Sequence, residues 1–125
     1  MNIAMKSSTR AALAMAAVLV LGACTGDAAR YETADDLAGA LAAADVECAA
    51  PEARPPATLV RSHASCGSGA SRLELFVFDG TEERDSWLRV GGQLGPVAVG
   101  PNWTVSGDTA GQAAAALNAR FDVPE

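Results

Sequence analysis

The chain has 125 residues, which is enough for one domain, and its formal net charge is −6. Half of the residues are hydrophobic but only 5% are aromatic, so we expect a modest core. An acidic surface repels phosphate groups. This excludes a nucleic-acid-binding class and also attachment to anionic lipids by charge alone.

The first 23 residues have the pattern of an export signal. Lys6 and Arg10 supply positive charge, and the 11 residues of the range 11–21 are apolar. A helix that spans a bilayer needs about 20 apolar residues, so this block fits a cleaved signal peptide over residues 1–23. The alternative is a buried helix of the folded domain, but no polar face interrupts the block at helical spacing. Removal of the peptide leaves 7 basic and 15 acidic residues, a net charge of −8.

The stretch LGAC at positions 21–24 resembles the lipobox of bacterial lipoproteins, in which an aliphatic residue and two small residues precede a cysteine. The resemblance implies cleavage before Cys24 and a diacylglycerol thioether on its sulfur. It also implies lipid anchoring on the extracytoplasmic face of the cell membrane. More than one acyl chain, palmitate for example, makes such an anchor stable. We expect a short tether over residues 24–32 and a single α+β domain over residues 33–125.

The next elements along the chain are a helix, an irregular stretch and two strands. Thr33 is expected to cap a first helix that ends near Asp45. Three prolines between residues 51 and 56 indicate irregular structure. Alternating apolar residues then predict strands over residues 58–66 and 72–78.

The two remaining cysteines fall on either side of the irregular stretch. Cys48 and Cys66 lie 18 positions apart and would share an oxidising compartment, so we predict a disulfide bond between them. Closing a loop of that size contributes about 3 kcal/mol in the chain-entropy model. Free buried thiols and a metal pair are the alternatives. His63 is the only histidine and zinc usually takes four ligands, so we expect no metal site.

The strand over residues 72–78 carries a candidate contact patch near its end. One face alternates through leucine and valine, while the other changes from polar to apolar at Phe76 and Phe78. Either another element covers these two phenylalanines or they form an exposed apolar surface. We take Phe76 and Phe78 as the candidate contact patch for a partner.

The C-terminal half is expected to contain a helix, two short strands and a last helix. Thr81 should cap the second helix, whose buried side includes Trp87, Leu88 and Val90. Strands over residues 97–99 and 103–105 should be joined by a turn at residues 100–102. A capping box of Thr109 and Gln112 predicts a last helix with an inner face that includes Ala113, Leu117 and Phe121.

The element order α-β-β-α-β-β-α predicts an α+β fold, with a sheet of about four mainly antiparallel strands packed by helices. A circularly permuted ferredoxin-like winding, which contains a split βαβ unit, is one topology that fits this order.

No residue pattern indicates a catalytic set or a cofactor. His63 follows Ser62, but adjacent strand residues point to opposite faces, so the two side chains cannot act as base and nucleophile. The acidic residues that follow Thr81 are explained by a solvated first helical turn. Asn102 begins a match to an N-glycosylation sequon, which we interpret as a turn residue instead.

The segments FVFDG, RDSWL and VGPNWTV are similar to small actinobacterial lipoproteins of uncharacterised function, over roughly residues 36–117. That resemblance includes a cysteine pair that matches Cys48 and Cys66. It implies lipid anchoring and an α+β domain, and it supplies no catalytic residues.

These observations favour a non-enzymatic, membrane-anchored module that binds an envelope protein or a cell-wall component and needs no cofactor. Two alternatives remain open. One is a small hydrolase that uses His63 with an acid from another segment. The other is a carrier of a small apolar ligand between the sheet and the helices.

Overall fold

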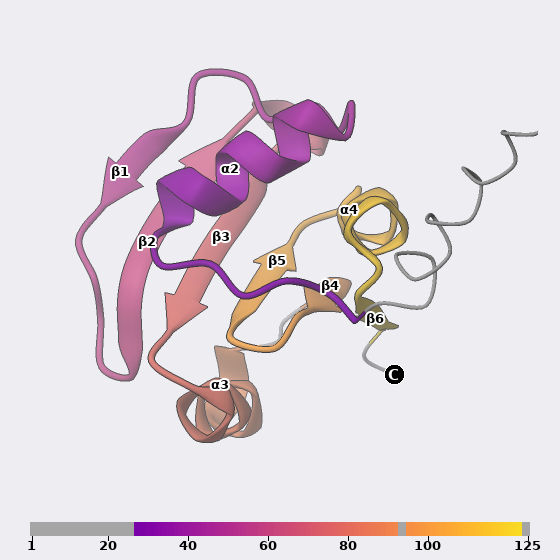
Figure 1. Ribbon diagram of the computed structural model, residues 1–125. Helices are drawn as coiled ribbons and strands as arrows, with labels where there is room; N and C mark the ends of the chain where they lie inside the picture. The colour runs from indigo at the N-terminus through magenta and orange to yellow at the C-terminus, as the bar shows by residue number, and fades with distance from the viewer. Residues whose placement is uncertain (1–26, 93–94, 124–125) are drawn as a thin grey trace, which may run out of the picture.

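The computed structural model describes residues 27–92 and 95–123 (Figure 1). Its α-helices are α2 (Ala34–Ala43), α3 (Thr81–Trp87) and α4 (Ala110–Leu117). The strands are β1 (Glu52–Arg54), β2 (Val60–Cys66), β3 (Leu73–Phe78), β4 (Val97–Val99), β5 (Trp103–Ser106) and β6 (Arg120–Asp122). A 3-10 turn spans Gly69–Ser71, and α3 continues as a π-helix over Leu88–Gly92. No helix in this described part is long and apolar enough to cross a bilayer.

The sheet has six strands in the order β1-β2-β3-β5-β4-β6, and every neighbouring pair is antiparallel. The α+β class and the antiparallel sheet are therefore confirmed, but the expected count of about four strands is wrong. The two additional strands, β1 and β6, lie at the edges and have three residues each. Strands this short carry no readable alternation, and only their pairing with β2 and β4 defines them.

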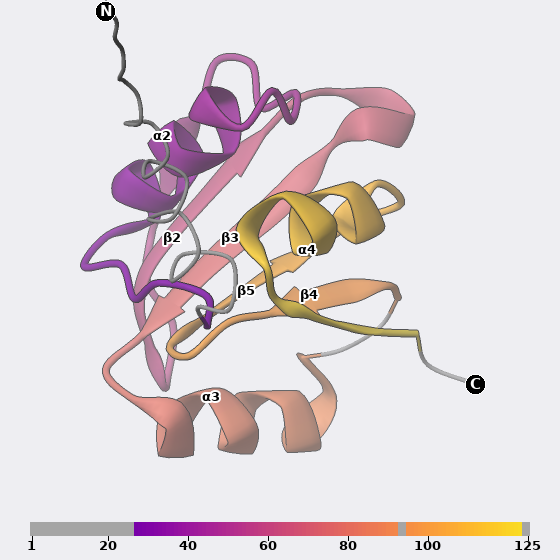
Figure 2. The ribbon, with the colours of Figure 1, turned by 45° about the vertical axis from the view of Figure 1, so that its right-hand side comes forward.

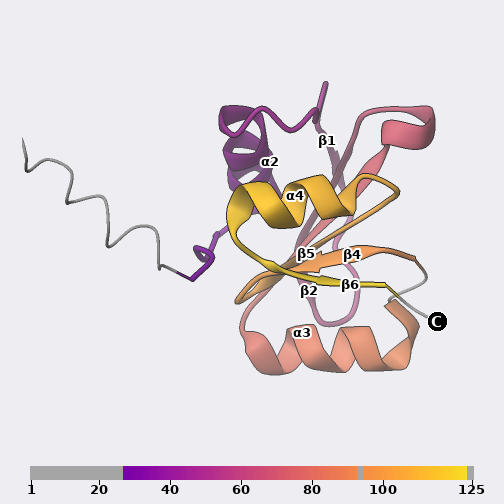
Figure 3. The same ribbon diagram turned by 90° about the vertical axis from the view of Figure 1, so that its right-hand side faces the viewer.

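Helices cover the two faces of the sheet unequally. Figure 3 shows α2 and α4 on one side and α3 on the other. The strand order places β5 between β3 and β4, and α3 joins β3 to β4, which is a split βαβ connection. Because α3 lies across the sheet from the other two helices, the helices form two layers (Figures 2 and 3).

The main core lies between the sheet and the pair α2 and α4. One row of residues crosses four neighbouring strands on this face: Ala64, Leu75, Val105 and Ala98. These four side chains are at most 1% exposed, as are Leu37 and Leu41 of α2 and Ala113 of α4. Burying each leucine stabilises the fold by about 2 kcal/mol. These side chains belong to one buried cluster between the sheet and the helices.

The N-terminus of α2 and the disulfide follow the predictions. Thr33 caps α2, and its hydroxyl accepts a hydrogen bond from Asp36 N at 3.1 Å. Cys48 and Cys66 form the predicted disulfide bond, which ties the loop after α2 to the end of β2. The bridge lies against the core, because Cys48 is 9% exposed and Cys66 is 2% exposed.

Several predictions about the C-terminal half are wrong. Val90 was expected on the buried side of the second helix but is 75% exposed. Thr109 and Gln112 form no side-chain capping box, since Gln112 N donates to the backbone oxygen of Thr109 instead. Phe121 lies in β6 and not on α4, because Asn118 adopts a left-handed conformation that ends the helix.

Candidate functional site

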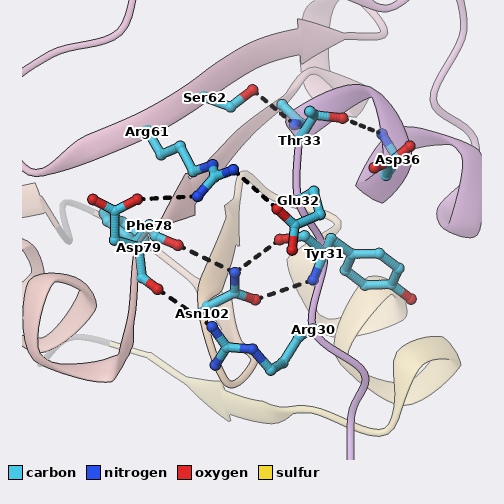
Figure 4. Close-up of polar contacts among 11 residues, drawn as sticks. Arg30, Tyr31, Glu32, Thr33, Asp36, Arg61, Ser62, Phe78, Asp79 and Asn102 are labelled. Atoms are coloured by element: carbon cyan, nitrogen blue, oxygen red, sulfur yellow. Dashed lines mark hydrogen bonds and ion pairs between the residues drawn. The ribbon is translucent and has the colours of Figure 1, made fainter.

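Residues 29–33, which lie a few positions after Cys24, are packed against the domain. Cys24 itself lies outside the described residues, as does the whole predicted signal peptide. From residue 29 onward, the segment predicted as a tether is hydrogen-bonded to the start of β5 and to the end of β3 (Figure 4). We call residues 29–33 the docked segment.

The side chains of Asn102 and Trp103 form hydrogen bonds with the backbone of the docked segment. The Asn102 side-chain amide accepts from Tyr31 N at 3.1 Å and donates to Tyr31 O at 2.8 Å (Figure 4). It also donates to Phe78 O at 3.1 Å, so both amide hydrogens are used. Trp103 Nε1 donates to Ala29 O at 2.8 Å. Asn102 is 4% exposed and Trp103 is fully buried, so these bonds are shielded from water.

Further polar contacts continue along the same segment. Arg61 bridges Glu32 at 2.9 Å and Asp79 at 3.3 Å, and Arg30 donates to Asp79 O at 3.3 Å (Figure 4). The Arg61 pairs are about half exposed or more and contribute little to stability. Ser62 Oγ accepts from Ala34 N at 2.8 Å, which satisfies a free donor at the start of α2. The docked segment is therefore held mainly by Asn102 and Trp103.

The docking limits how far the domain can lie from Cys24. Five peptide links separate Cys24 from Ala29, and a fully extended chain covers at most about 3.5 Å per residue. The lipid attachment site would thus lie within roughly 17 Å of the point where the domain fixes the chain.

The sequence predicts Asn102 as a turn residue but does not reveal that its side chain also binds the docked segment. Gly100 N donates to Trp103 O at 2.9 Å, so the predicted turn exists. Gly100 is required there because a Cβ atom would collide with the Trp103 indole ring. The amide of Asn102 is consumed by its three hydrogen bonds, which excludes the folded chain as a substrate for glycosylation at the sequon.

The second notable surface is one end of the sheet face that α3 leaves uncovered. We call it the open sheet face and define it by Glu52 and Arg54 of β1, His63 and the buried Ser65 of β2, Glu74 of β3, and Arg72 directly before β3. Cross-strand pairing places Arg54 beside His63 and Ser65 beside Glu74. Arg54 Nε donates to Ser65 Oγ at 3.1 Å.

A chain of charged groups crosses this open sheet face. His63 Nε2 lies 2.9 Å from Glu74 Oε1, and Arg72 Nε donates to Glu74 Oε2 at 2.8 Å. Partial burial acts to raise the pKa of Glu74, but the hydrogen bonds from His63 and Arg72 outweigh it and lower the pKa below its ordinary value. Glu74 is therefore an ionised acceptor that orients both neighbours.

The predicted contact patch of Phe76 and Phe78 does not form, because α3 covers it. Trp87 packs on Phe76 with ring centroids 4.5 Å apart and on Phe78 at 5.6 Å. Phe78 is fully buried, so it cannot contact a partner. Phe76 is partly buried and its other ring neighbour is His63, at 4.2 Å. These aromatic contacts mark the boundary between the covered sheet face and the open one.

The hydrolase alternative gains one element from this geometry, because His63 is paired with Glu74, an acid from another segment. Ser62 lies on the face opposite His63 and contacts α2, as predicted, so the pair is not a nucleophile and base. A hollow of about 240 Å³ beside β2, lined by Ser62, His63 and Asp35 among others, is smaller than the roughly 300–1,000 Å³ of small-molecule sites. Within the described ranges, no group of three or more metal-ligating side chains occurs.

Comparisons with known proteins add no relative. No protein-family model matches the chain, and no curated protein or solved structure matches it either.

Proposed function

We propose that the chain is a lipid-anchored extracytoplasmic module that holds an interaction domain close to the membrane surface and has no catalytic role. The observation that carries the proposal is the docked segment, which begins five residues after Cys24. A domain that starts directly after a lipobox-like stretch is suited to anchoring at short range. A hydrolase would also need a nucleophile beside the His63–Glu74 pair, and the nearby hydroxyls of Ser62 and Ser65 accept hydrogen bonds from Ala34 N and Arg54 Nε instead.

The open sheet face is the surface we propose for contact with an envelope protein or a cell-wall component. Ser65 holds Arg54, and Glu74 holds His63 and Arg72, so these side chains lose little freedom when a partner binds. Both signs of charge alternate across this face, which suits polar recognition of a partner with complementary groups. A carrier of apolar ligands would instead need an unfilled interior, and the buried side chains between sheet and helices form one contiguous cluster.

Palmitate labelling in the native host tests the anchor. We expect label and membrane retention for the natural chain, and loss of both for Cys24→Ser. Thr25→Ser is the matched control, because it alters the neighbouring hydroxyl residue and leaves the thiol intact. Cys48 and Cys66 are held in the disulfide and should take up no label. A Cys24→Ser chain that still carries label would refute the lipid assignment.

Site-directed photo-cross-linking in cells tests the interaction surface. A photoreactive residue is placed at Arg54 on the open sheet face or at Ala116 on the exposed side of α4. We expect a discrete cross-linked species from position 54 and none from position 116. Equal yields from both positions would refute the open sheet face as the contact surface.

A further inference from the structure

The edge strand β6 has the composition and geometry of a self-pairing surface. It ends the sheet beside β4 and lies next to α4 (Figure 3). Phe121 is 44% exposed and Val123 is 59% exposed, although both are large and apolar. An edge strand that exposes apolar side chains is available for pairing with another strand.

The backbone of Phe121 points away from β4. Gly100 N donates to Trp103 O, and Gly107 N donates to Pro96 O, which fixes the alternation of hydrogen-bonded pairs between β4 and β5. By that alternation, the backbone N–H and C=O of Ala98 are hydrogen-bonded to β5, and those of Val97 and Val99 are directed to β6. The N–H and C=O of Phe121, which is registered opposite Ala98, are therefore directed to the open edge.

The sequence of β6 is complementary to itself in an antiparallel pair. When two copies meet with Phe121 opposite Phe121, a two-fold axis relates the copies, and the two phenylalanines exchange both backbone hydrogen bonds across it. Arg120 of each copy then lies opposite Asp122 of the other, in the closer type of cross-strand pair. Within one chain these two residues already form an ion pair at 3.0 Å on the same face of the strand.

We infer that β6 pairs antiparallel with β6 of a second copy of this chain around a two-fold axis at Phe121. The two sheets then continue into each other, and the pairing covers Phe121 and Val123 of both copies. A two-fold axis makes the same patch serve both partners, as an isologous dimer requires.

The opposite edge, β1, does not offer the same surface. Glu52 and Arg54 are also of opposite charge and flank Ala53, but Pro51 and Pro55 enclose the strand and have no N–H groups. Prolines at an edge are a common protection against pairing. The β1 edge therefore serves as an internal control for β6.

Charge reversal on the full chain, purified from membranes in detergent and studied by native mass spectrometry, tests the inference. The samples are kept near 100 µM, where a dimer with a micromolar Kd is populated. We expect dimers of the natural chain and at least about tenfold weaker dimerisation of Arg120→Asp and of Asp122→Arg, because each places like charges opposite each other. Glu52→Arg in β1 should leave dimerisation unchanged.

Mixing the two variants separates pairing from a merely structural effect. Arg120→Asp mixed with Asp122→Arg restores two opposite-charge pairs between copies, so heterodimers should form. The double variant Arg120→Asp/Asp122→Arg should dimerise like the natural chain. Any of three results would overturn the inference: a monomeric natural chain, single variants that dimerise normally, or a mixture that gives no heterodimer.

Discussion

Replacing Asn102 by alanine should release the docked segment and destabilise the domain. The change removes the three hydrogen bonds that the amide makes to Tyr31 and Phe78. A typical hydrogen bond contributes about 0.5–1.5 kcal/mol net, and polar groups left buried without a partner cost more. Since Asn102 is 4% exposed, water cannot replace these bonds without opening the structure.

We expect Asn102→Ala to lower the free energy of unfolding by about 2–4 kcal/mol. In a domain of this size that corresponds to a fall in Tm of roughly 10–20 °C. Urea unfolding followed by circular dichroism measures the first quantity, and a thermal scan measures the second. Gln112→Ala is the matched control, because this exposed amide lies on α4 and should change stability by less than about 0.5 kcal/mol.

Limited trypsin digestion shows whether the loss is local to the docked segment. Trypsin cuts after Arg30, and the neighbouring backbone at Ala29 and Tyr31 is hydrogen-bonded in the folded chain. We expect cleavage at this site to accelerate strongly in Asn102→Ala, because segments of low local stability are cut first. A variant that loses less than about 1 kcal/mol and keeps the site protected would refute the docking argument.

Three further predictions concern the core, the disulfide and pH. The fully buried Thr104 hydroxyl has no hydrogen-bond partner among the described residues, so Thr104→Val should stabilise by about 1 kcal/mol; an unchanged urea midpoint would contradict this. Replacing both Cys48 and Cys66 by alanine should cost about 3 kcal/mol, and reducing agent should then have no further effect on the unfolding curve. Folding lowers the pKa of Glu74, so the ionised carboxylate stabilises the folded chain. This contribution to the free energy of unfolding is complete above the ordinary glutamate pKa and is lost on acidification. Glu74→Gln should therefore lose less stability than the natural chain between about pH 5 and pH 3, and equal losses in urea titrations would be evidence against this role.

Much of the local structure could be predicted because the signals were local. The Thr33 cap, the strand over residues 72–78 and the turn at residues 100–102 depend on neighbouring residues, and all three exist. The disulfide could be predicted because only two cysteines remained after Cys24 was assigned to the lipid. The edge strands β1 and β6 could not, because three residues are too few to show a period.

The candidate site was less accessible to prediction. Phe76 and Phe78 were singled out because the pattern of β3 shows that both faces are apolar near its end. The pattern does not say which element covers them, and Trp87 of α3 does so from another part of the chain. Asn102 was not singled out as a contact residue, because its type and position are those of a turn. Its side chain nevertheless bonds Tyr31, which lies 71 positions away in the chain.

The sequence by itself determined the α+β class and the pairing of Cys48 with Cys66, and its lipobox-like stretch is the basis of the proposed lipid attachment at Cys24. Each depends on residue identity, on composition or on a period within one element. Only the tertiary structure decided that the presumed tether is docked, that α3 covers the phenylalanines and that β6 forms an open edge. Those features depend on contacts between distant segments, and such contacts leave no periodic or compositional mark in the chain.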